Sequence, residues 1–102
     1  MITLPDDFSD KKVCVLGLGY VGLTLAVAMA RAGFSVHGLE VQKKVITSLN
    51  KGKAHFWEKN LDINLNQAIK NGNFTFSEGL NKSIDASVYI VTVGTPLDSN
   101  NL

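Results

Sequence analysis

The sequence predicts an α/β fold: a four-stranded parallel sheet in the spatial order 3-2-1-4, flanked by helices and incomplete on its C-terminal side. Short apolar segments of strand character alternate with segments of helical periodicity along the 102-residue chain. Such alternation is typical of βαβ units, whose strands pair in parallel through right-handed crossovers. In addition, a glycine-rich turn, GLGYVG, separates the first strand from the first helix, as in Rossmann-like folds.

Residues 11–16 are the first predicted strand, because their centre, VCVL, is continuously apolar, as in strands buried on both faces. Residues 20–32 follow as a helix whose alanines permit close packing against the sheet. Gly33 ends this helix, since glycine is common just past a helix C-terminus. Residues 34–40, FSVHGLE, form the second strand by their β-branched and apolar content.

Two further helices are predicted from apolar residues at helical spacing, one in residues 41–52 and one in residues 61–72. Each closes on a glycine. The loop between them, residues 53–60, carries Phe56 and Trp57. We expect these two rings to be packing anchors, because they lack the basic interleaving of a base-stacking platform.

The last part of the chain contains two more strands. Residues 73–77 are the third predicted strand, and residues 87–93, SVYIVTV, are the strongly β-prone fourth. Residues 78–86 between them are expected to form a short helix or turn, and a polar tail follows the fourth strand. We expect residues 11–102 to form one partial domain, preceded by an extension of residues 1–10.

Composition and charge exclude several classes of protein. An apolar content of 45% with 19% charged residues indicates a globular chain rather than a disordered one. The net charge is +1 and the basic residues are scattered, so no nucleic-acid partner is indicated. No secretory signal and no membrane-spanning stretch is apparent, so we expect no membrane partner. A single cysteine fits a reducing compartment, and we expect a cytoplasmic protein.

Gly17, Gly19 and Gly22 form a G-x-G-x-x-G motif between the first strand and the first helix. In a dinucleotide-binding turn, the first glycine permits the sharp exit from the strand, and the third lets the helix lie close to it. The second lets a pyrophosphate approach the backbone, where free N–H groups at the helix N-terminus bind its oxygens. Alternatively, the three glycines serve only packing.

Glu40 ends the second predicted strand, about 20 residues beyond the glycines. An acid at this point accepts hydrogen bonds from the hydroxyls of an adenosine ribose. Its negative charge would repel the 2′-phosphate of NADP, so the sequence favours NAD as the cofactor. The neighbouring Lys43 and Lys44 leave NADP open, because basic residues can accommodate that phosphate.

The run KVCVLGLGYVGLTLAVAMARAGFSVHGLE, followed in order by SLNKG, FWE and VTVGTPLD, resembles the UDP-glucose/GDP-mannose dehydrogenase family. The similarity covers nearly the whole chain after Asp10, and GLGYVGL is much more specific than a bare glycine motif. The resemblance implies an NAD-dependent nucleotide-sugar 6-dehydrogenase, an oxidoreductase of polysaccharide biosynthesis. Members of this family oxidise the C6 alcohol of a UDP- or GDP-linked sugar to a carboxylate, using two NAD in succession.

The resemblance also implies which residues contact NAD. They lie in the glycine turn, after the second strand, in the second helix and in the loop after the fourth strand: Gly17, Gly19, Tyr20, Val21, Gly22, Glu40, Lys44 and Thr95. The sequence departs from the family in three places. Glu40 replaces a more usual aspartate, and the segment before Val45 is one residue short. Lys59-Asn60 stands where the family has Pro-Gly, which leaves the role of Glu58 open.

No catalytic residue and no metal site is expected in this chain. The family's catalytic cysteine, lysine and asparagine lie beyond Leu102, so we expect a fragment that binds cofactor without performing the oxidation. Cys14 lies in a predicted buried strand with no basic neighbour, and is expected to be core rather than a nucleophile. His37 and His55 lack partners at metal-ligand spacing and are expected to be structural.

Two other functions stay open: a regulatory NAD-sensing module, and the cofactor half of a 3-hydroxyacid-type dehydrogenase. A cysteine, lysine and asparagine elsewhere in the full-length protein would favour the enzyme over the sensor. The VGTPLD run argues against the 3-hydroxyacid type. A sheet that ends at the fourth strand leaves an apolar edge open to pairing. We therefore expect self-association, and a homo-oligomer with a nucleotide sugar as its small-molecule partner.

Overall fold

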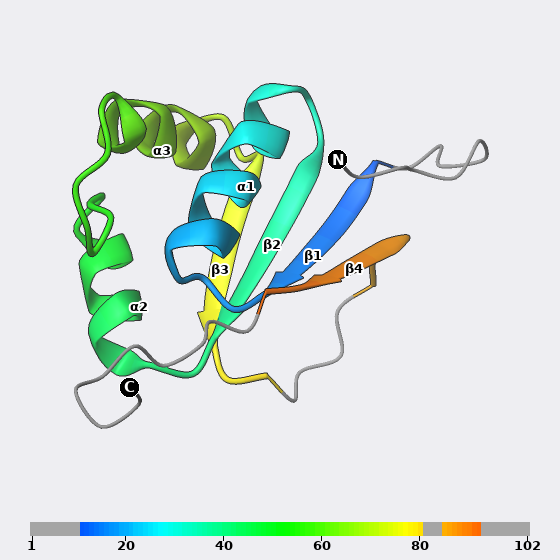
Figure 1. The fold of residues 1–102 in the computed structure, drawn as a ribbon. Coiled ribbons are helices and arrows are strands. Elements are labelled where there is room, and N and C mark those ends of the chain that lie inside the picture. Colours follow the sequence, from blue (N-terminus) through cyan, green and yellow to red (C-terminus); the bar gives the residue numbers. More distant parts are fainter. Residues whose placement is uncertain (1–10, 81–84, 93–102) are drawn as a thin grey trace.

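The computed structural model describes residues 11–80 and 85–92 of the chain. Four strands form one parallel sheet in the order β3-β2-β1-β4 (Figure 1), which confirms the predicted fold. In chain order the elements are β1 (Lys12–Leu16), α1 (Tyr20–Arg31), β2 (Ser35–Glu40), α2 (Lys43–Asn50), α3 (Leu61–Lys70), β3 (Phe74–Glu78) and β4 (Val88–Val91).

All three helices lie along the same side of the sheet (Figure 1). This arrangement follows from the chain path, because right-handed crossovers from β1 to β2 and from β2 to β3 bring their helices to one face. The chain then returns to place β4 beside β1, so β1 is a central strand between β2 and β4. The carboxyl ends of the parallel strands therefore meet at one edge, where the turn into α1 begins.

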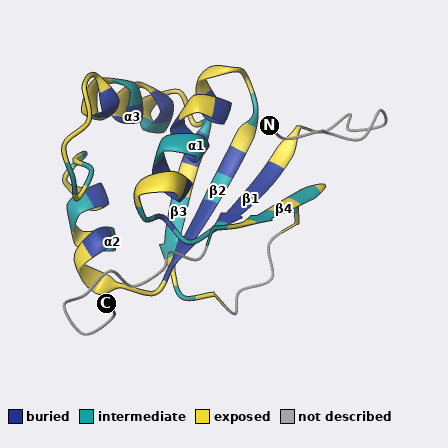
Figure 2. Cartoon of the chain, in the orientation of Figure 1, coloured by how far each residue is buried: buried dark blue, intermediate teal, exposed yellow. Residues whose placement is uncertain are grey.

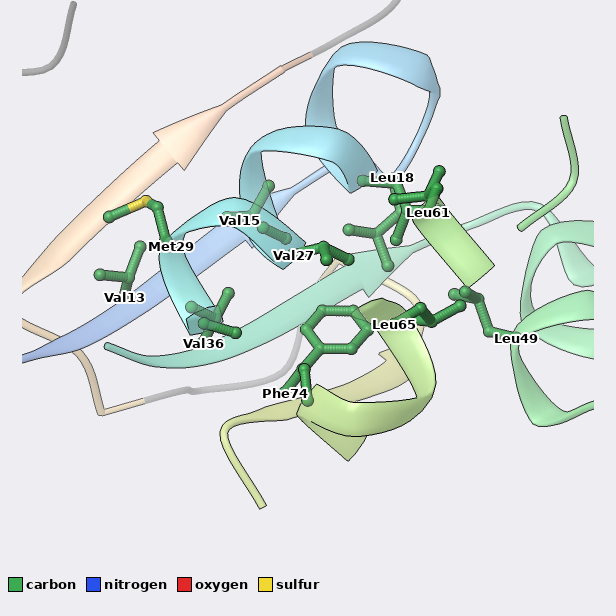
Figure 3. Close-up of a cluster of buried hydrophobic side chains, with 14 of the residues drawn as sticks. Val13, Val15, Leu18, Val27, Met29, Val36, Leu49, Leu61, Leu65 and Phe74 are labelled. Atoms are coloured by element: carbon green, nitrogen blue, oxygen red, sulfur yellow. The ribbon is translucent and has the colours of Figure 1, made fainter. Parts of the chain in front are cut away.

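The core lies between the sheet and the helices, as the burial pattern and the side-chain close-up show (Figures 2 and 3). The strands contribute Val13, Val15, Val36 and Phe74, and the helices contribute mainly Leu23, Ala26, Val27, Ala30, Leu49 and Leu65. The centre of β1 is at most 1% exposed, as its continuous apolar run predicts. Buried alanines on α1 let this helix approach the sheet closely.

The helix ends follow the predicted glycines. Gly33 has a φ of +102°, and the N–H of Phe34 donates to the carbonyl of Met29 across this turn. Gly52 and Gly72, which follow α2 and α3, also have positive φ. In contrast, β3 begins and ends one residue later than predicted. Residues 81–84, part of the predicted helix or turn, lie outside the described residues, as do the extension and the tail.

Strand β4 forms the sheet edge at which we predict self-association. Within residues 11–80 and 85–92, β4 pairs with β1 alone. Two of its apolar side chains, Tyr89 and Val91, are more than half exposed. Self-association at this edge stays a prediction.

Candidate functional site

The glycine turn leaves the carboxyl end of β1 and enters α1 at Tyr20. Gly17, its first residue, has a φ of +97°, a conformation that glycine adopts at little cost. The N–H of Gly17 donates to the carbonyl of Leu39 near the end of β2, at 2.8 Å. The turn is therefore bound to the neighbouring strand from its first residue.

Leu18, between the first two glycines, is fully buried. Its side chain lies against Gly38 of β2, where a Cβ would come within 2.7 Å of both Leu18 methyl carbons. Its N–H donates to Oε1 of Glu40 at 2.6 Å. Both the side chain and the backbone of this turn residue are thus anchored on β2.

The third glycine lies in a closely packed position. A Cβ on Gly22 would overlap the carbonyl oxygen of Gly17 and Oγ1 of Thr92. A Cβ on Gly17 would overlap the carbonyl oxygen of Thr92. Thr92 directly follows β4, and its Oγ1 lies 2.7 Å from the carbonyl oxygen of Gly17. The ends of β1 and β4 and the start of α1 therefore meet with no room for another carbon atom.

Gly19 differs from the other two glycines of the motif. Its φ of −71° is open to any residue, and a Cβ placed on it would have no atom within 4 Å. Neither backbone conformation nor packing within the protein explains a glycine here. The space in front of its backbone is open, as the close approach of a pyrophosphate requires.

The first turn of α1 presents free backbone donors. The first bond of the helix runs from the N–H of Leu23 to the carbonyl of Gly19, at 2.9 Å. Among the described residues, the N–H groups of Gly19, Tyr20, Val21 and Gly22 have no partner. No side chain caps this end, and no acid lies in the first turn. The positive end of the helix dipole is therefore available to an anion.

Glu40 ends β2 and is only 5% exposed. Besides the bond from Leu18, its carboxylate accepts a hydrogen bond from the N–H of Gln42 at Oε2, at 2.9 Å. Charge-assisted hydrogen bonds of this kind offset the cost of burying a carboxylate. Glu40 thereby links the glycine turn to the turn that begins α2.

Two basic residues, Lys44 and His55, lie near each other, and His55 also lies near Glu40. Lys44 is exposed in the first turn of α2. His55, expected to be structural, lies near enough to Glu40 and Lys44 to sense both charges. Partial burial lowers the pKa of His55, while Glu40 raises it and Lys44 lowers it to smaller extents. No spacing in the sequence signals this proximity, because a loop rather than a regular element positions His55.

Residues 51–60, the aromatic loop, connect α2 to α3 and contact the start of α1. The ring centroids of Tyr20 and Phe56 are 4.9 Å apart, and the Tyr20 hydroxyl donates to Oε1 of Glu58 at 3.1 Å. This hydrogen bond and the negative charge of Glu58 raise the pKa of Tyr20. Phe56 packs against the core, but Trp57 is 84% exposed. The prediction of Trp57 as a packing anchor is wrong, because only one of these adjacent rings faces inward.

Side chains of α3 hold the aromatic loop in place. Oδ1 of Asp62 accepts a hydrogen bond from the N–H of Ala54 at 2.8 Å, and Nδ2 of Asn66 donates to the carbonyl of Gly52 at 2.7 Å. Asn60, which precedes the helix, has a left-handed φ of +66°, a conformation that asparagine adopts more readily than most residues. A position where the resemblance expects glycine thus keeps a conformation that favours glycine.

The remaining candidates of the sequence have structural surroundings. Cys14 is fully buried and free, and burial raises the pKa of its thiol, which confirms its prediction as core. The ring nitrogens of His37 lie 2.7 Å from Oγ1 of Thr75 and 2.9 Å from Oγ of Ser77. Within the described part of the chain, no three His, Cys, Asp or Glu residues form a group that could hold a metal ion. No described helix is long and apolar enough to cross a membrane.

Several known proteins are similar to this chain. Residues 11–101 match the model of the UDP-glucose/GDP-mannose dehydrogenase family, NAD binding domain. The chain is 32% identical over 90 residues to the UDP-N-acetyl-D-mannosamine dehydrogenase of Pyrococcus horikoshii, and the match covers 88% of this chain and 22% of that protein.

Two solved structures have the same fold over most of this chain. A UDP-D-ManNAc dehydrogenase from Pyrococcus horikoshii gives a TM-score of 0.77 at 32% identity, over 87% of this chain and 21% of that one. A ternary complex of GDP-mannose dehydrogenase from Pseudomonas aeruginosa gives 0.76 at 31% identity, with the same coverage of 87% and 21%. The chain thus spans about a fifth of the length of these relatives.

Of the predicted cofactor contacts, Thr95 lies outside the described residues.

Proposed function

The chain belongs to the UDP-glucose/GDP-mannose dehydrogenase family, within its NAD binding domain, and from this premise we propose how it binds the cofactor. The pyrophosphate of NAD lies against Gly19 and accepts hydrogen bonds from the N–H groups of Tyr20 and Val21. Gly17 and Gly22 shape the turn, and Glu40 accepts hydrogen bonds from the adenosine ribose. Lys44 and Thr95 complete the proposed set of cofactor contacts.

The open space at Gly19 is the observation that carries this proposal. If the three glycines served only packing, each would lie against other protein atoms. Gly17 and Gly22 do, whereas a Cβ on Gly19 would meet nothing within 4 Å. The free N–H groups and the absence of an acid in the first turn of α1 suit a phosphate at the same place.

Glu40 supports NAD rather than NADP as the cofactor. Its carboxylate is held at both oxygens by backbone N–H groups, yet each oxygen retains a lone pair for a ribose hydroxyl. A 2′-phosphate would bring further negative charge against this fixed carboxylate. The exposed ammonium of Lys44 lies on the adenosine side of the site as a second contact.

For the whole protein, we propose a nucleotide-sugar dehydrogenase that oxidises the C6 alcohol of a UDP- or GDP-linked sugar to a carboxylate. Bound NAD supplies the hydride acceptor for such an oxidation. Within that protein, this chain binds and orients the cofactor, in a domain comprising residues 11–102. A nucleotide-sugar substrate, a homo-oligomeric assembly and a cytoplasmic location belong to the same proposal.

The experiment is a Gly19→Ala substitution, assayed by calorimetric titration with NAD. Alanine fits both the backbone conformation and the open space but is a poorer N-cap than glycine, so the free energy of unfolding should fall by no more than about 1 kcal/mol. The added methyl group would stand where the pyrophosphate approaches. We expect NAD binding to weaken by about tenfold or more, and the unaltered chain to bind NADP more weakly than NAD.

Ser35→Ala is the matched control, because Ser35 is exposed at the opposite, amino end of β2. It should bind NAD as the unaltered chain does. Exposed Trp57 provides a second readout, through its fluorescence. If neither calorimetry nor fluorescence detects binding at millimolar NAD, or if Gly19→Ala binds as tightly as the unaltered chain, the proposed site is wrong.

A further inference from the structure

We propose that Thr92 is a positioning residue for the cofactor site, acting together with Glu40 on a single peptide group. This group is the peptide between Gly17 and Leu18, at the centre of the glycine turn. The inference rests on the proposed function, because it concerns how the turn is set for a pyrophosphate. No glycine motif or acid in the sequence signals Thr92, which lies in the run after the fourth strand.

The Gly17–Leu18 peptide is held at both of its polar atoms. Its carbonyl oxygen accepts a hydrogen bond from Oγ1 of Thr92 at 2.7 Å, and its N–H donates to Oε1 of Glu40 at 2.6 Å. The hydroxyl of Thr92 also lies 3.3 Å from the carbonyl oxygen of Leu16, so Gly17 is its nearer acceptor. One side chain after β4 and one at the end of β2 therefore fix the plane of this peptide from opposite strands.

The position of Thr92 is itself fixed by the sheet. Val91 pairs with Leu16 in the register of β4 and β1, and the N–H of Thr92 donates to the carbonyl of Leu16 at 2.9 Å. A threonine suits this place because its branched side chain has few rotamers and carries a donor. The missing Cβ of Gly22 leaves the room that Oγ1 occupies.

The orientation of this peptide matters for an anion. The Gly17–Leu18 peptide rotates through ψ of Gly17 and φ of Leu18, and glycine, which lacks a Cβ, leaves its own ψ less restricted than other residues do. If the Gly17 carbonyl lost its donor, it could turn its oxygen toward the space beside Gly19, where it would repel a phosphate. With Thr92 in place, the carbonyl is bonded within the protein, and the N–H groups of residues 19–22 keep no partner among the described residues.

The test compares variants that differ by one hydroxyl group. Thr92→Val replaces the hydroxyl with a methyl group, and Thr92→Ser keeps the hydroxyl. If the valine variant does not fold, Thr92→Ala is compared with Thr92→Ser instead. Thr47→Val, at an exposed residue of α2, is the matched control. Each is titrated by NMR with NAD, with ADP-ribose and with adenosine, and amide exchange is followed at Gly17 and Leu18, whose N–H groups are hydrogen-bonded.

We expect Thr92→Val to weaken NAD and ADP-ribose binding by about fivefold, the effect of one lost hydrogen bond. Adenosine, which lacks the pyrophosphate, should bind unchanged. Thr92→Ser should restore both affinities, and Thr47→Val should alter none. Amide exchange at Gly17 and Leu18 should accelerate in Thr92→Val and Thr92→Ala but not in Thr92→Ser.

Two results would overturn the role of Thr92. One is equal loss of affinity for ADP-ribose and adenosine, which indicates general damage to the domain. The other is equal behaviour of the serine and alanine variants, which shows that the hydroxyl has no part. If the unaltered chain binds no NAD, the proposed function fails, while the exchange rates at Gly17 and Leu18 still decide whether Thr92 orders the turn.

Discussion

The glycine turn and the aromatic loop adjoin each other at the start of α1, yet they are held in opposite ways. In the turn, backbone groups pack against one another so closely that a single methyl group has no room at Gly22. In the loop, exposed polar side chains of α3 hold the backbone at a few points, and Trp57 faces solvent. Order in the first region comes from excluded space together with buried and part-buried hydrogen bonds, and in the second from a few exposed hydrogen bonds.

This difference has a consequence for function. A surface that must meet a small anion with backbone N–H groups needs a fixed backbone, and close packing provides it. A loop that borders the site needs only an approximate position. Tyr20 belongs to both regions, because its N–H lies in the first turn of α1 while its ring and hydroxyl contact Phe56 and Glu58.

The largest effect should come from breaking the packed region with Gly22→Ala. The new Cβ would overlap the carbonyl oxygen of Gly17 and Oγ1 of Thr92, and backbone cannot move aside cheaply. We expect the free energy of unfolding in urea to fall by about 2–3 kcal/mol. Gly19→Ala is the matched control in the same turn and should lower it by no more than about 1 kcal/mol, the cost of alanine at the helix N-cap. Equal stability of the two variants would contradict the comparison.

A smaller effect should come from releasing the loop with Asp62→Ala. This change removes the acceptor of the Ala54 N–H and an acid from the first turn of α3. We expect a loss of about 1 kcal/mol in urea unfolding, with faster amide exchange at Ala54. Asp62→Asn keeps an acceptor oxygen and should protect Ala54. Unchanged amide exchange at Ala54 in Asp62→Ala would show that the hydrogen bond between Ala54 and Asp62 does not order the loop.

The smallest effect concerns the contact between the two regions. Glu58 raises the pKa of Tyr20, so the folded chain keeps the phenol proton at a pH where the unfolded chain loses it. The resulting stabilisation is present below the unfolded pKa and is lost as pH rises through the folded pKa. Glu58→Gln should lower the pKa of Tyr20, measured by ultraviolet titration in a Tyr89→Phe background. An unchanged titration would mean that the hydroxyl does not meet Glu58 in solution.

Sequence patterns predicted the fold because each element carries its own local signal. The apolar centre of β1, the helical spacing of α2 and α3, and the glycines past the helix ends act within a few residues. The strand order followed from crossover handedness and from the glycine turn. Boundaries moved by a residue at β3, because Gly72 marks the end of α3 but does not fix the residue at which strand pairing begins.

The site was predicted less completely, because part of it is assembled by contacts between residues far apart in the sequence. Such contacts leave no pattern of spacing in the sequence. Gly17, Gly19 and Glu40 belong to a recognisable pattern. Thr92 and His55 do not, since the pairing of β4 with β1 brings one to the turn and an irregular loop brings the other to Glu40. For Trp57, the sequence predicted a packing role that the structure does not show. Its hydrophobicity suggested burial, but Phe56 beside it fills the inward position.

The bond between Thr92 and Gly17 also bears on how the chain acquires its function during synthesis. Its two residues are 75 positions apart in the sequence, so the contact closes late, as long-range contacts in parallel sheets do. A nascent chain that has produced β1, α1 and β2 already contains all three glycines and Glu40. It still lacks the donor for the Gly17 carbonyl until the ribosome has passed residue 92. We therefore expect competence for the cofactor to arise with the docking of β4, rather than with completion of the motif itself.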